Sequence, residues 1–498
     1  MRGAVRATWA ALLGLAAAAG TALAAPPDPI GPGVRDALAR DGRVRVMIVV
    51  DAAPPSPSSP PRRGARPEMR ETVDAILETL LPGDLRVERR FGAVAALAAT
   101  LNERGLQAIA RHPRTRRVDL DAPGRSTMLE SRPLAQIDQL FDSGFTGSGA
   151  LVAVLDTGVH LAHPDLGGAV VDEACFCSGG DGCCPNGQAS QQGFGSAQDD
   201  HRHGSNVAGI IVSDGFVSPR GGAPDATLIA VKVLDSNATF CCSSDVVAGL
   251  DWLIQNHPDV DVVNLSLGTD ALFAGACDDA TAFTIAYAEA IGALRALGAI
   301  TVGSSGNNGS GTQMVAPACI ADTISVAAAW DASVGAQFVL GCADLSTQAD
   351  KVTCYSNTNS QLDLVASGNP MTSAGYPANT STFVGTSNAS PLVSACAGLL
   401  RGLMPEIPAN DLEAALRTSP VQVVDVTNGL SFPRLDCEAA LAATGFQIVR
   451  VPALPAPATA LLAALLGSGG VLQLARRRGP RRARQHVEEA QLAAQTRR

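Results

Sequence analysis

Three short motifs bring an acid, a base and a hydroxyl into one chain. Asp156 ends an apolar run in VLDTGV, His203 opens a helical stretch in HGSNVAG, and Ser387 opens another in GTSNASP. A serine hydroxyl becomes a nucleophile when an imidazole takes its proton, and a carboxylate can orient that imidazole. Taken singly, each residue also has a structural interpretation, because Asp and Ser commonly cap helices and a lone His is usually structural.

The elements around these motifs indicate an open α/β sheet. Uninterrupted β-branched and apolar runs predict strands buried on both faces, as in a parallel sheet. The functional loops of such a sheet lie at the carboxyl ends of its strands, where Asp156 is found. The predicted strands are 150–155, 227–234, 260–267, 299–302 and 323–328, and the predicted helices are 205–212, 244–257, 280–297 and 387–403.

A smaller unit precedes this sheet. Its pattern predicts the order βαββαβ, which is ferredoxin-like, with strands at 44–51, 85–91, 94–101 and 117–121 and helices at 67–81 and 103–111. Residues 1–135 carry 20 Lys and Arg against 14 Asp and Glu, whereas residues 136–449 carry 8 against 31. A basic unit before a strongly acidic one predicts mutual attraction, and a stand-alone interaction domain is the alternative. The net charge of −10 excludes a generic nucleic-acid binder.

Together and in this order, the three motifs resemble the subtilisin-like serine proteases, or subtilases. The resemblance covers roughly residues 130–445, and the front unit more weakly. It implies a subtilisin-like, mainly parallel sheet with helices on both faces. It also implies that Ser387 attacks a peptide carbonyl, that His203 moves the proton and that Asp156 orients the imidazole. In this family the front unit is an inhibitory prodomain that guides folding.

The resemblance extends to the groups around the reaction. His201 is a rival base, but His203 carries the HG start of the motif. Asn307, in GSSGNNG, matches the side-chain donor to the oxyanion, with Asn308 as its rival. An Asn-Gly run is otherwise typical of a turn. The backbone N–H of Ser387 is expected to be the second donor.

Substrate binding is expected on two walls. Ser266, Leu267 and Gly268 match the strand that pairs with the substrate backbone, and Ser304, Ser305 and Gly306 match the opposite wall of the primary specificity pocket. Val315 falls where family members with a roomy pocket have Gly. A valine there predicts a short pocket and a preference for small or medium apolar residues before the cleaved bond.

The sequence departs from the family at several positions. Asn206 stands where a second His is usual, and Asn388 where Met is common. Asp165 matches a structural calcium ligand of some members, but the loop 213–222 lacks the expected Asn-rich stretch, so a purely structural Asp165 is the alternative. The chemistry itself requires no metal or other cofactor.

The ends and the cysteines predict export. Residues 1–24 resemble a signal peptide, with an apolar run and an Ala-Leu-Ala cleavage site. Residues 451–475 are uncharged and precede a cluster of Arg, which predicts a membrane or sorting helix. All 12 cysteines lie between Cys175 and Cys437, an arrangement that indicates disulfides in an exported protein. Cys241, Cys242 and the insertion's own cysteines at 175–187 are expected to supply the disulfides that staple these loops, with their partners left open. The pairs 277–319, 342–354 and 396–437 are plausible.

These observations predict four segments: a signal peptide at 1–24, an inhibitor-like prodomain at 25–128, a catalytic domain at 129–448 and a linker, helix and basic tail at 449–498. The predicted function is an exported serine endopeptidase made as a self-processing precursor, which is cut within 121–133. Its partners would be polypeptide substrates, its own prodomain and, through the tail, a membrane. An anchored binding module and an ester hydrolase are the alternatives.

Overall fold

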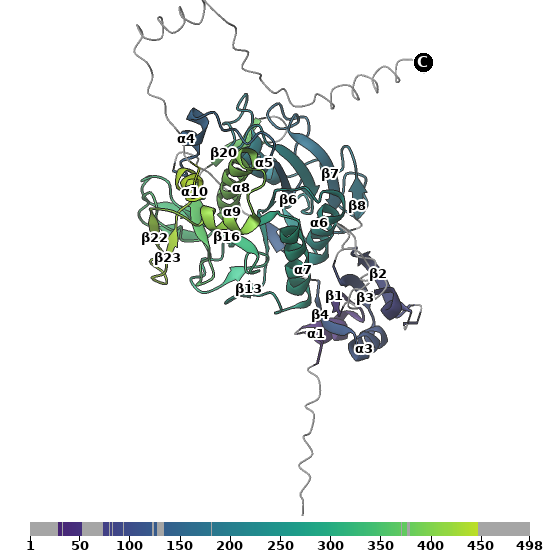
Figure 1. Cartoon of the computed structure of the whole chain (residues 1–498). Helices are drawn as coiled ribbons and strands as arrows, with labels where there is room; N and C mark the ends of the chain where they lie inside the picture. The colour runs from purple at the N-terminus through teal and green to yellow at the C-terminus, as the bar shows by residue number, and fades with distance from the viewer. Residues whose placement is uncertain are drawn as a thin grey trace, which may run out of the picture. The chain divides into compact units, whose positions relative to one another are not determined.

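A central eight-stranded sheet organises the computed structural model, which describes residues 28–51, 73–121, 124–126 and 134–446 except 32, 79, 82, 93, 181, 370 and 376–378. Seven strands run parallel, and β8 at one edge is antiparallel (Figure 1). The predicted parallel sheet is therefore confirmed. In spatial order the strands are β19 (Leu364–Ser367), β16 (Thr323–Ala329), β14 (Ile300–Ser304), β11 (Val262–Leu265), β6 (Leu151–Asp156), β9 (Thr227–Lys232), β7 (Val170–Phe176) and β8 (Ser190–Gln192).

Helices cover both faces of this sheet. A β-carbon on Gly398 of α8 (Thr386–Leu403) would lie 3.5 Å from Val152 of β6, so α8 packs on one face. A β-carbon on Gly249 of α6 (Ser243–Asn256) would lie 3.0 Å from Leu155 of the same strand, so α6 packs on the other. Helix α5 (His203–Val212) packs beside α8, and α7 (Ala282–Ala296) beside α6. Burial of both faces explains the uninterrupted apolar strands.

The front unit has the predicted βαββαβ order. Its antiparallel sheet is ordered β2-β3-β1-β4, with β1 at Val44–Val50, β2 at Leu85–Arg90, β3 at Ala96–Leu101 and β4 at Thr115–Leu120. Residues 73–77 form the described part of the first crossover helix, and α3 (Glu103–Arg111) is the second. An additional helix, α1 (Val34–Asp41), was not predicted, because its short apolar face consists of Val34, Ala37 and Leu38 alone.

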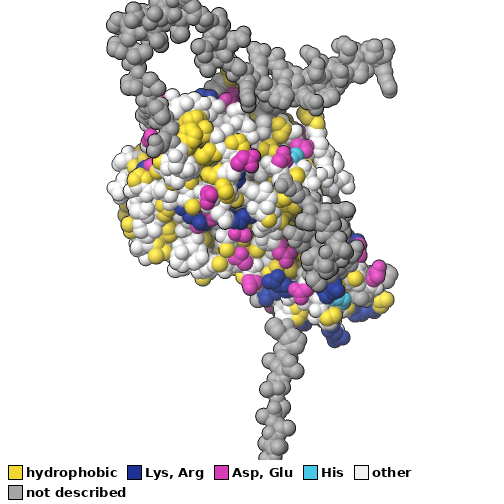
Figure 2. All heavy atoms as spheres, viewed as in Figure 1, with side chains coloured by type: hydrophobic (Ala, Val, Ile, Leu, Met, Phe, Trp, Pro, Cys, Tyr) yellow, Lys and Arg dark blue, Asp and Glu magenta, His cyan; other side chains and the backbone are white. Residues whose placement is uncertain are grey.

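The front unit shares a hydrophobic core with helices α6 and α7. Met47 and Val49 of β1 are buried in one cluster with Leu250 of α6 and with Tyr287 and Ile291 of α7. Lys and Arg side chains gather on the visible surface of the front unit (Figure 2), as its composition predicts. The two units are thus joined by an apolar interface as well as by opposite charge.

The disulfides match every pair that the sequence named. Cys277–Cys319, Cys342–Cys354 and Cys396–Cys437 are paired as expected. For the other six cysteines the sequence left the partners open, and the structure gives them. The insertion closes on itself through Cys175–Cys184 and Cys177–Cys183, and the adjacent Cys241 and Cys242 bond to each other.

Shorter elements complete the described chain. Within the described residues, no helix combines the length and the apolar character that crossing a bilayer requires. The predicted signal peptide and C-terminal tail both lie outside the described residues. The remaining elements are α4 (Ile137–Asp142), α9 (Ala409–Leu416), α10 (Cys437–Ala443), β5 (Gly124–Ser126), β10 (Thr239–Phe240), β12 (Leu267–Thr269), β13 (Leu272–Phe273), β15 (Met314–Val315), β17 (Gln337–Val339), β18 (Cys342–Asp344), β20 (Met371–Gly375), β21 (Asn379–Phe383), β22 (Gln422–Val424) and β23 (Ser431–Pro433).

Candidate active site

Asp156 and His203 meet at the carboxyl end of the central sheet. Asp156 is the last residue of β6 and His203 the first of α5, and both are fully buried. His203 Nδ1 is hydrogen-bonded to Asp156 Oδ1, which also accepts the Thr157 N–H at 2.7 Å. A neutral imidazole that donates from Nδ1 keeps its lone pair on Nε2, the form a general base requires. Asp156 therefore orients an imidazole and does not cap a helix.

A buried carboxylate that the sequence interpretation missed holds this pair in place. Asp199 Oδ1 accepts the Thr157 hydroxyl at 2.9 Å, and Asp199 Oδ2 accepts the Ser205 N–H at 3.0 Å. The Thr157 hydroxyl in turn accepts the Gly204 N–H at 2.8 Å. These bonds clasp the end of β6 to the start of α5. The only signal in the sequence was the pair of acidic residues Asp199 and Asp200 just before the histidine motif.

His201, the rival base, lies beside this pair without joining it. Its ring centroid is 6.4 Å from that of His203 and 6.3 Å from that of Phe383. Its backbone N–H donates to Asp199. Burial lowers the pKa of His201, and the neighbouring His203 lowers it further. The imidazole bonded to Asp156 is that of His203.

Ser387 is the second residue of α8 and is fully buried in the described chain. Gly385, with φ of 149°, is the N-cap, so the alternative of Ser387 as an N-cap is wrong. The Ser266 hydroxyl donates to the Ser387 carbonyl at 2.5 Å, which fixes the helix start against the strand predicted to bind substrate. Helix α8 packs against α5, and the two departures from the family pattern, Asn388 and Asn206, meet between them with 3.5 Å between Nδ2 and Oδ1.

Asn307 lies directly next to the start of α8. Its Oδ1 accepts both the backbone N–H and the hydroxyl of Thr386, each at 2.9 Å. Its Nδ2 is buried and has no partner among the described residues. Asn308 differs, because its Oδ1 accepts from Asn357 Nδ2 at 3.0 Å and its N–H donates to Asn357 Oδ1. Asn307 is thus tied to Thr386, the residue preceding Ser387, whereas Asn308 is tied to Asn357.

The predicted specificity pocket is a hollow of about 200 Å³ near Asn307. Val315 fills the space between its two walls: a β-carbon on Gly268 would lie 2.3 Å from Val315 Cγ2, and one on Gly306 would lie 2.7 Å from Val315 Cγ1. Ser305 stands behind the wall, with its hydroxyl donating to the Asn357 carbonyl at 2.7 Å. The residues that line the hollow are Gly268, Thr269, Asp270, Ser304, Gly306, Asn307, Asn308 and Val315.

The strand next to this hollow is already paired with another part of the chain. β5 (Gly124–Ser126) lies between β10 and β12, antiparallel to both. Arg125 is opposite Gly268, and Ser126 is opposite Leu267. An extended peptide that completes a sheet in this way is bound through its backbone, independently of most side chains.

Asp165, the candidate calcium ligand, is engaged by the protein itself. Its carboxylate accepts the N–H groups of Phe216, Val217 and Ser218 at 2.7 to 3.1 Å, and the Ser218 hydroxyl at 2.7 Å. Burial alone would raise the pKa of Asp165, but the bonds from Ser218 and Val217 outweigh it and lower the pKa. The loop 213–222 is thus held by amide donors in the place where a cation would otherwise hold it, which fits the structural alternative.

Comparison with known proteins gives the family. The subtilase family model matches residues 147–435, more than half of the chain. An extracellular serine proteinase of Thermus sp. (strain Rt41A) is 31% identical over 353 residues, which cover 68% of this chain and 74% of that protein. Subtilisin DY of Bacillus licheniformis is 29% identical over 296 residues, 59% of this chain and 91% of that protein. Subtilisin E of Bacillus subtilis (strain 168) is 30% identical over 320 residues, 63% of this chain and 72% of that protein.

The chain therefore belongs to the subtilase family of serine endopeptidases. The fold expected from the resemblance, an α/β sheet with helices on both faces, is confirmed. The substrates of such an enzyme are polypeptides.

Proposed function

We propose that this subtilase is made as an exported, self-processing precursor and that Asp156, His203 and Ser387 form its catalytic triad. Ser387 attacks the scissile carbonyl as His203 Nε2 takes its proton, and the protonated imidazole then passes that proton to the leaving amine. Asp156 holds the imidazole through Nδ1 and stabilises its charged form. The buried Asp156–His203 bond at the end of β6 supports these roles.

Asn307 is the oxyanion donor in this proposal. Its Oδ1 is bound twice by Thr386, so the amide is fixed and Nδ2 is presented as a donor. A donor that is oriented before the reaction stabilises the tetrahedral intermediate without reorganisation. The backbone N–H of Ser387 at the start of α8 is the second donor.

Val315 limits the residue that precedes the scissile bond. Its methyl groups occupy the space between Gly268 and Gly306, which supports the shallow pocket expected from the sequence. Small and medium side chains therefore fit best. Ser266, Leu267 and Gly268 bind the substrate backbone as an added strand, and Ser304 to Gly306 form the facing wall.

The single observation that carries the self-processing proposal is the position of β5. This strand belongs to the junction 121–133 and pairs with the same strand that is proposed to bind substrates. The precursor thus presents its own junction to its own site, and a junction bound there excludes other substrates until it is cut and released.

The front unit, proposed residues 25–128, acts as the inhibitor. Asp121 accepts the Ser244 N–H at 2.8 Å at the start of α6, and Asp119 accepts the Ala282 N–H at the start of α7. Carboxylates at helix N-termini are favourable because they compensate unpaired N–H groups and the helix dipole. Two caps and a shared apolar core hold this unit on the catalytic domain, proposed residues 129–448.

Export is supported by the extracellular relative and by six disulfides in the described chain. The proposed signal peptide at 1–24 and the membrane or sorting tail at 449–498 rest on sequence alone. Fractionation of cells that express the full chain, compared with a chain ending at residue 448, tests the tail: retention only of the full chain supports it, and equal release of both excludes it.

Peptide hydrolysis is tested on the processed enzyme with casein and a short-chain ester as competing substrates. We expect a much higher kcat/KM for peptide bonds than for the ester. His203→Ala should neither process itself nor hydrolyse either substrate. An enzyme that cleaves the ester but leaves casein intact would favour the esterase alternative. A well-folded chain inactive on both substrates would favour a binding module.

A further inference from the structure

Arg89 of β2 places its guanidinium in a closely fitted pocket of the catalytic domain. Nε and Nη2 donate to Asp245 Oδ1 at 3.1 and 2.6 Å, and Nη2 also donates to the Ala189 carbonyl at 3.0 Å. Its Cζ lies 5.6 Å from the centroid of the Phe176 ring. The Arg89 side chain is only 10% exposed. The pocket thus meets the charge, the donors and the flat face of a guanidinium.

The cysteine-rich insertion builds one side of this pocket. Ser178, beside the Cys177–Cys183 bridge, donates to Asp245 through its N–H at 2.9 Å and its hydroxyl at 2.8 Å. Ser178 Oγ also accepts from Nη2 of Arg45, a second front-unit arginine, at 3.0 Å. The insertion, which the minimal family pattern lacks, therefore contacts the front unit and fixes the carboxylate that binds Arg89.

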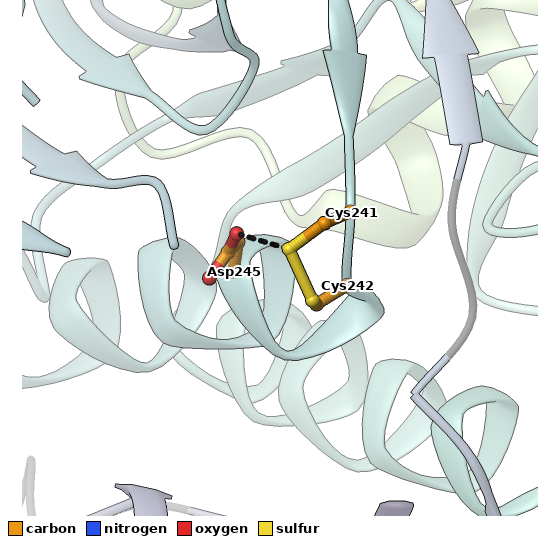
Figure 3. A group of neighbouring side chains, drawn as sticks. All are labelled: Cys241, Cys242 and Asp245. Atoms are coloured by element: carbon orange, nitrogen blue, oxygen red, sulfur yellow. Dashed lines mark hydrogen bonds between the residues drawn. A yellow bond between two sulfur atoms is a disulfide. The ribbon is translucent and has the colours of Figure 1, made fainter. Parts of the chain in front are cut away.

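The bridge between Cys241 and Cys242 closes the other side. Cys241 Sγ lies 3.8 Å from Asp245 Oδ2 (Figure 3) and 3.5 Å from Ser178 Oγ. Cys242 is the N-cap of α6, the helix that carries Asp245. Cys241, Cys242 and Asp245 are close enough to hold a metal ion together, but the two sulfurs are bonded to each other and offer no thiolate.

Asp245 depends on a cationic partner. Its side chain is fully buried, and burial raises the pKa of Asp245 because it disfavours the charged form, while Arg89 opposes that effect. A buried carboxylate that loses its partner is left strongly destabilised. Arg89 therefore stabilises a buried charge of the catalytic domain while the front unit is bound.

We propose that Asp245, Ser178, Phe176 and the Ala189 carbonyl form a guanidinium-binding site that locks the front unit on the enzyme after cleavage. The proposal rests on the proposed function, because it presumes that the front unit inhibits. Small guanidinium compounds then compete with Arg89 and hasten release. A hollow of about 430 Å³ borders Arg89 and Phe176, two of the groups in this contact.

The test follows activation of the full chain. A gel gives the time of cleavage, and the delay is the interval between cleavage and the appearance of peptide hydrolysis. We expect Arg89→Met to shorten this delay on the order of tenfold or more. Arg89→Lys should be intermediate, because an ammonium keeps the charge but loses the fork and the ring contact. Arg86→Met is the matched control: Arg86 is on the same strand, 73% exposed and bonded to Glu88, and its loss should leave the delay unchanged.

A ligand arm does not depend on the folding of any variant. Agmatine should shorten the delay of the wild-type chain in proportion to its concentration, and cadaverine, an amine of similar length, should not. Equal delays in the Arg89 and Arg86 variants, or equal effects of agmatine and cadaverine, would overturn the proposal that the Arg89 contact holds the front unit on the enzyme. A wild-type chain that is never cleaved would instead count against the proposed self-processing.

Discussion

Thr386 and Asn307 are joined twice, since both the backbone N–H and the hydroxyl of Thr386 donate to Asn307 Oδ1 at 2.9 Å. The same hydroxyl accepts the Gly306 N–H at 3.1 Å. Because Oδ1 is fully used, the amide cannot rotate without losing two bonds, and Nδ2 remains the group presented next to Ser387. Thr386, the residue before the proposed nucleophile, thus orients the proposed oxyanion donor.

Asn307→Ala should lower kcat by about 10²–10³ with little change in KM, because the donor acts mainly on the tetrahedral intermediate. Steady-state kinetics on one peptide substrate measure both constants. Asn308→Ala is the control, since Asn308 is committed to Asn357. A larger loss of kcat in the Asn308 variant than in the Asn307 variant would contradict the assignment of Asn307 as the oxyanion donor.

Val315→Gly should deepen the specificity pocket. Removing the methyl groups that separate Gly268 from Gly306 should raise kcat/KM for Phe before the scissile bond, relative to Ala, by at least about tenfold. The ratio of kcat/KM for Phe to that for Ala should be intermediate in Val315→Ala, between the wild type and Val315→Gly. Profiling with a peptide series that differs only at this position decides the matter, and an unchanged Phe-to-Ala ratio in both variants would mean that another residue sets the depth.

Asp165→Asn should destabilise the catalytic domain by about 1–3 kcal/mol near pH 7, because the amide group brings donors of its own to the N–H groups of the loop 213–222. The folded-state pKa of Asp165 is lowered, so its contribution is present above the unfolded pKa of about 3.9 and is lost as pH falls through the folded pKa. Thermal melts across pH measure this. A difference between variant and wild type that persisted unchanged below the folded-state pKa would contradict the assignment.

The register of β5 predicts the processing site. Arg125 is opposite Gly268 and Ser126 is opposite Leu267. If the bound junction keeps this register for one more residue, the residue after Ser126 is the one that faces Ser266. Ser266 is the residue bonded to Ser387. We therefore expect cleavage between Thr127 and Met128, one residue before the domain boundary proposed from the sequence, with Thr127 bound in the shallow pocket. N-terminal sequencing of the processed enzyme should begin at Met128, and a mature end more than one residue away would refute this register.

The sequence predicted the fold and much of the site because both depend on local patterns. Continuous β-branched runs are typical of strands buried on both faces, and β6 and β9 are such strands. The positions of Asp156 and His203 follow from where a strand ends and a helix begins. Val315 was identified differently, through the resemblance to the family, whose members with a roomy pocket have Gly there.

Several contacts that the fold creates were not predictable from the sequence. The acidic pair that contains Asp199 is visible in the sequence, but nothing there shows that this carboxylate binds Thr157, just after β6, and Ser205 in α5. The pairing of Cys241 with Cys242 was missed because connectivity depends on which sulfurs the fold brings together. The recognition of Arg89 by Asp245 joins residues 156 positions apart.

The central claim is that Ser387 cuts the chain's own junction. The precursor without its tail is expressed as wild type, Ser387→Ala and Ser390→Ala, with Ser390 as a neighbouring buried hydroxyl on α8. Each is exposed to a fluorophosphonate probe and analysed by gel and intact mass. The account predicts that the wild type and the Ser390 variant are cut within 121–133 and labelled, with the label on Ser387, while the Ser387 variant stays full length and unlabelled. A folded wild-type chain that remains uncut and unlabelled, or a Ser387 variant that still processes itself, would contradict it.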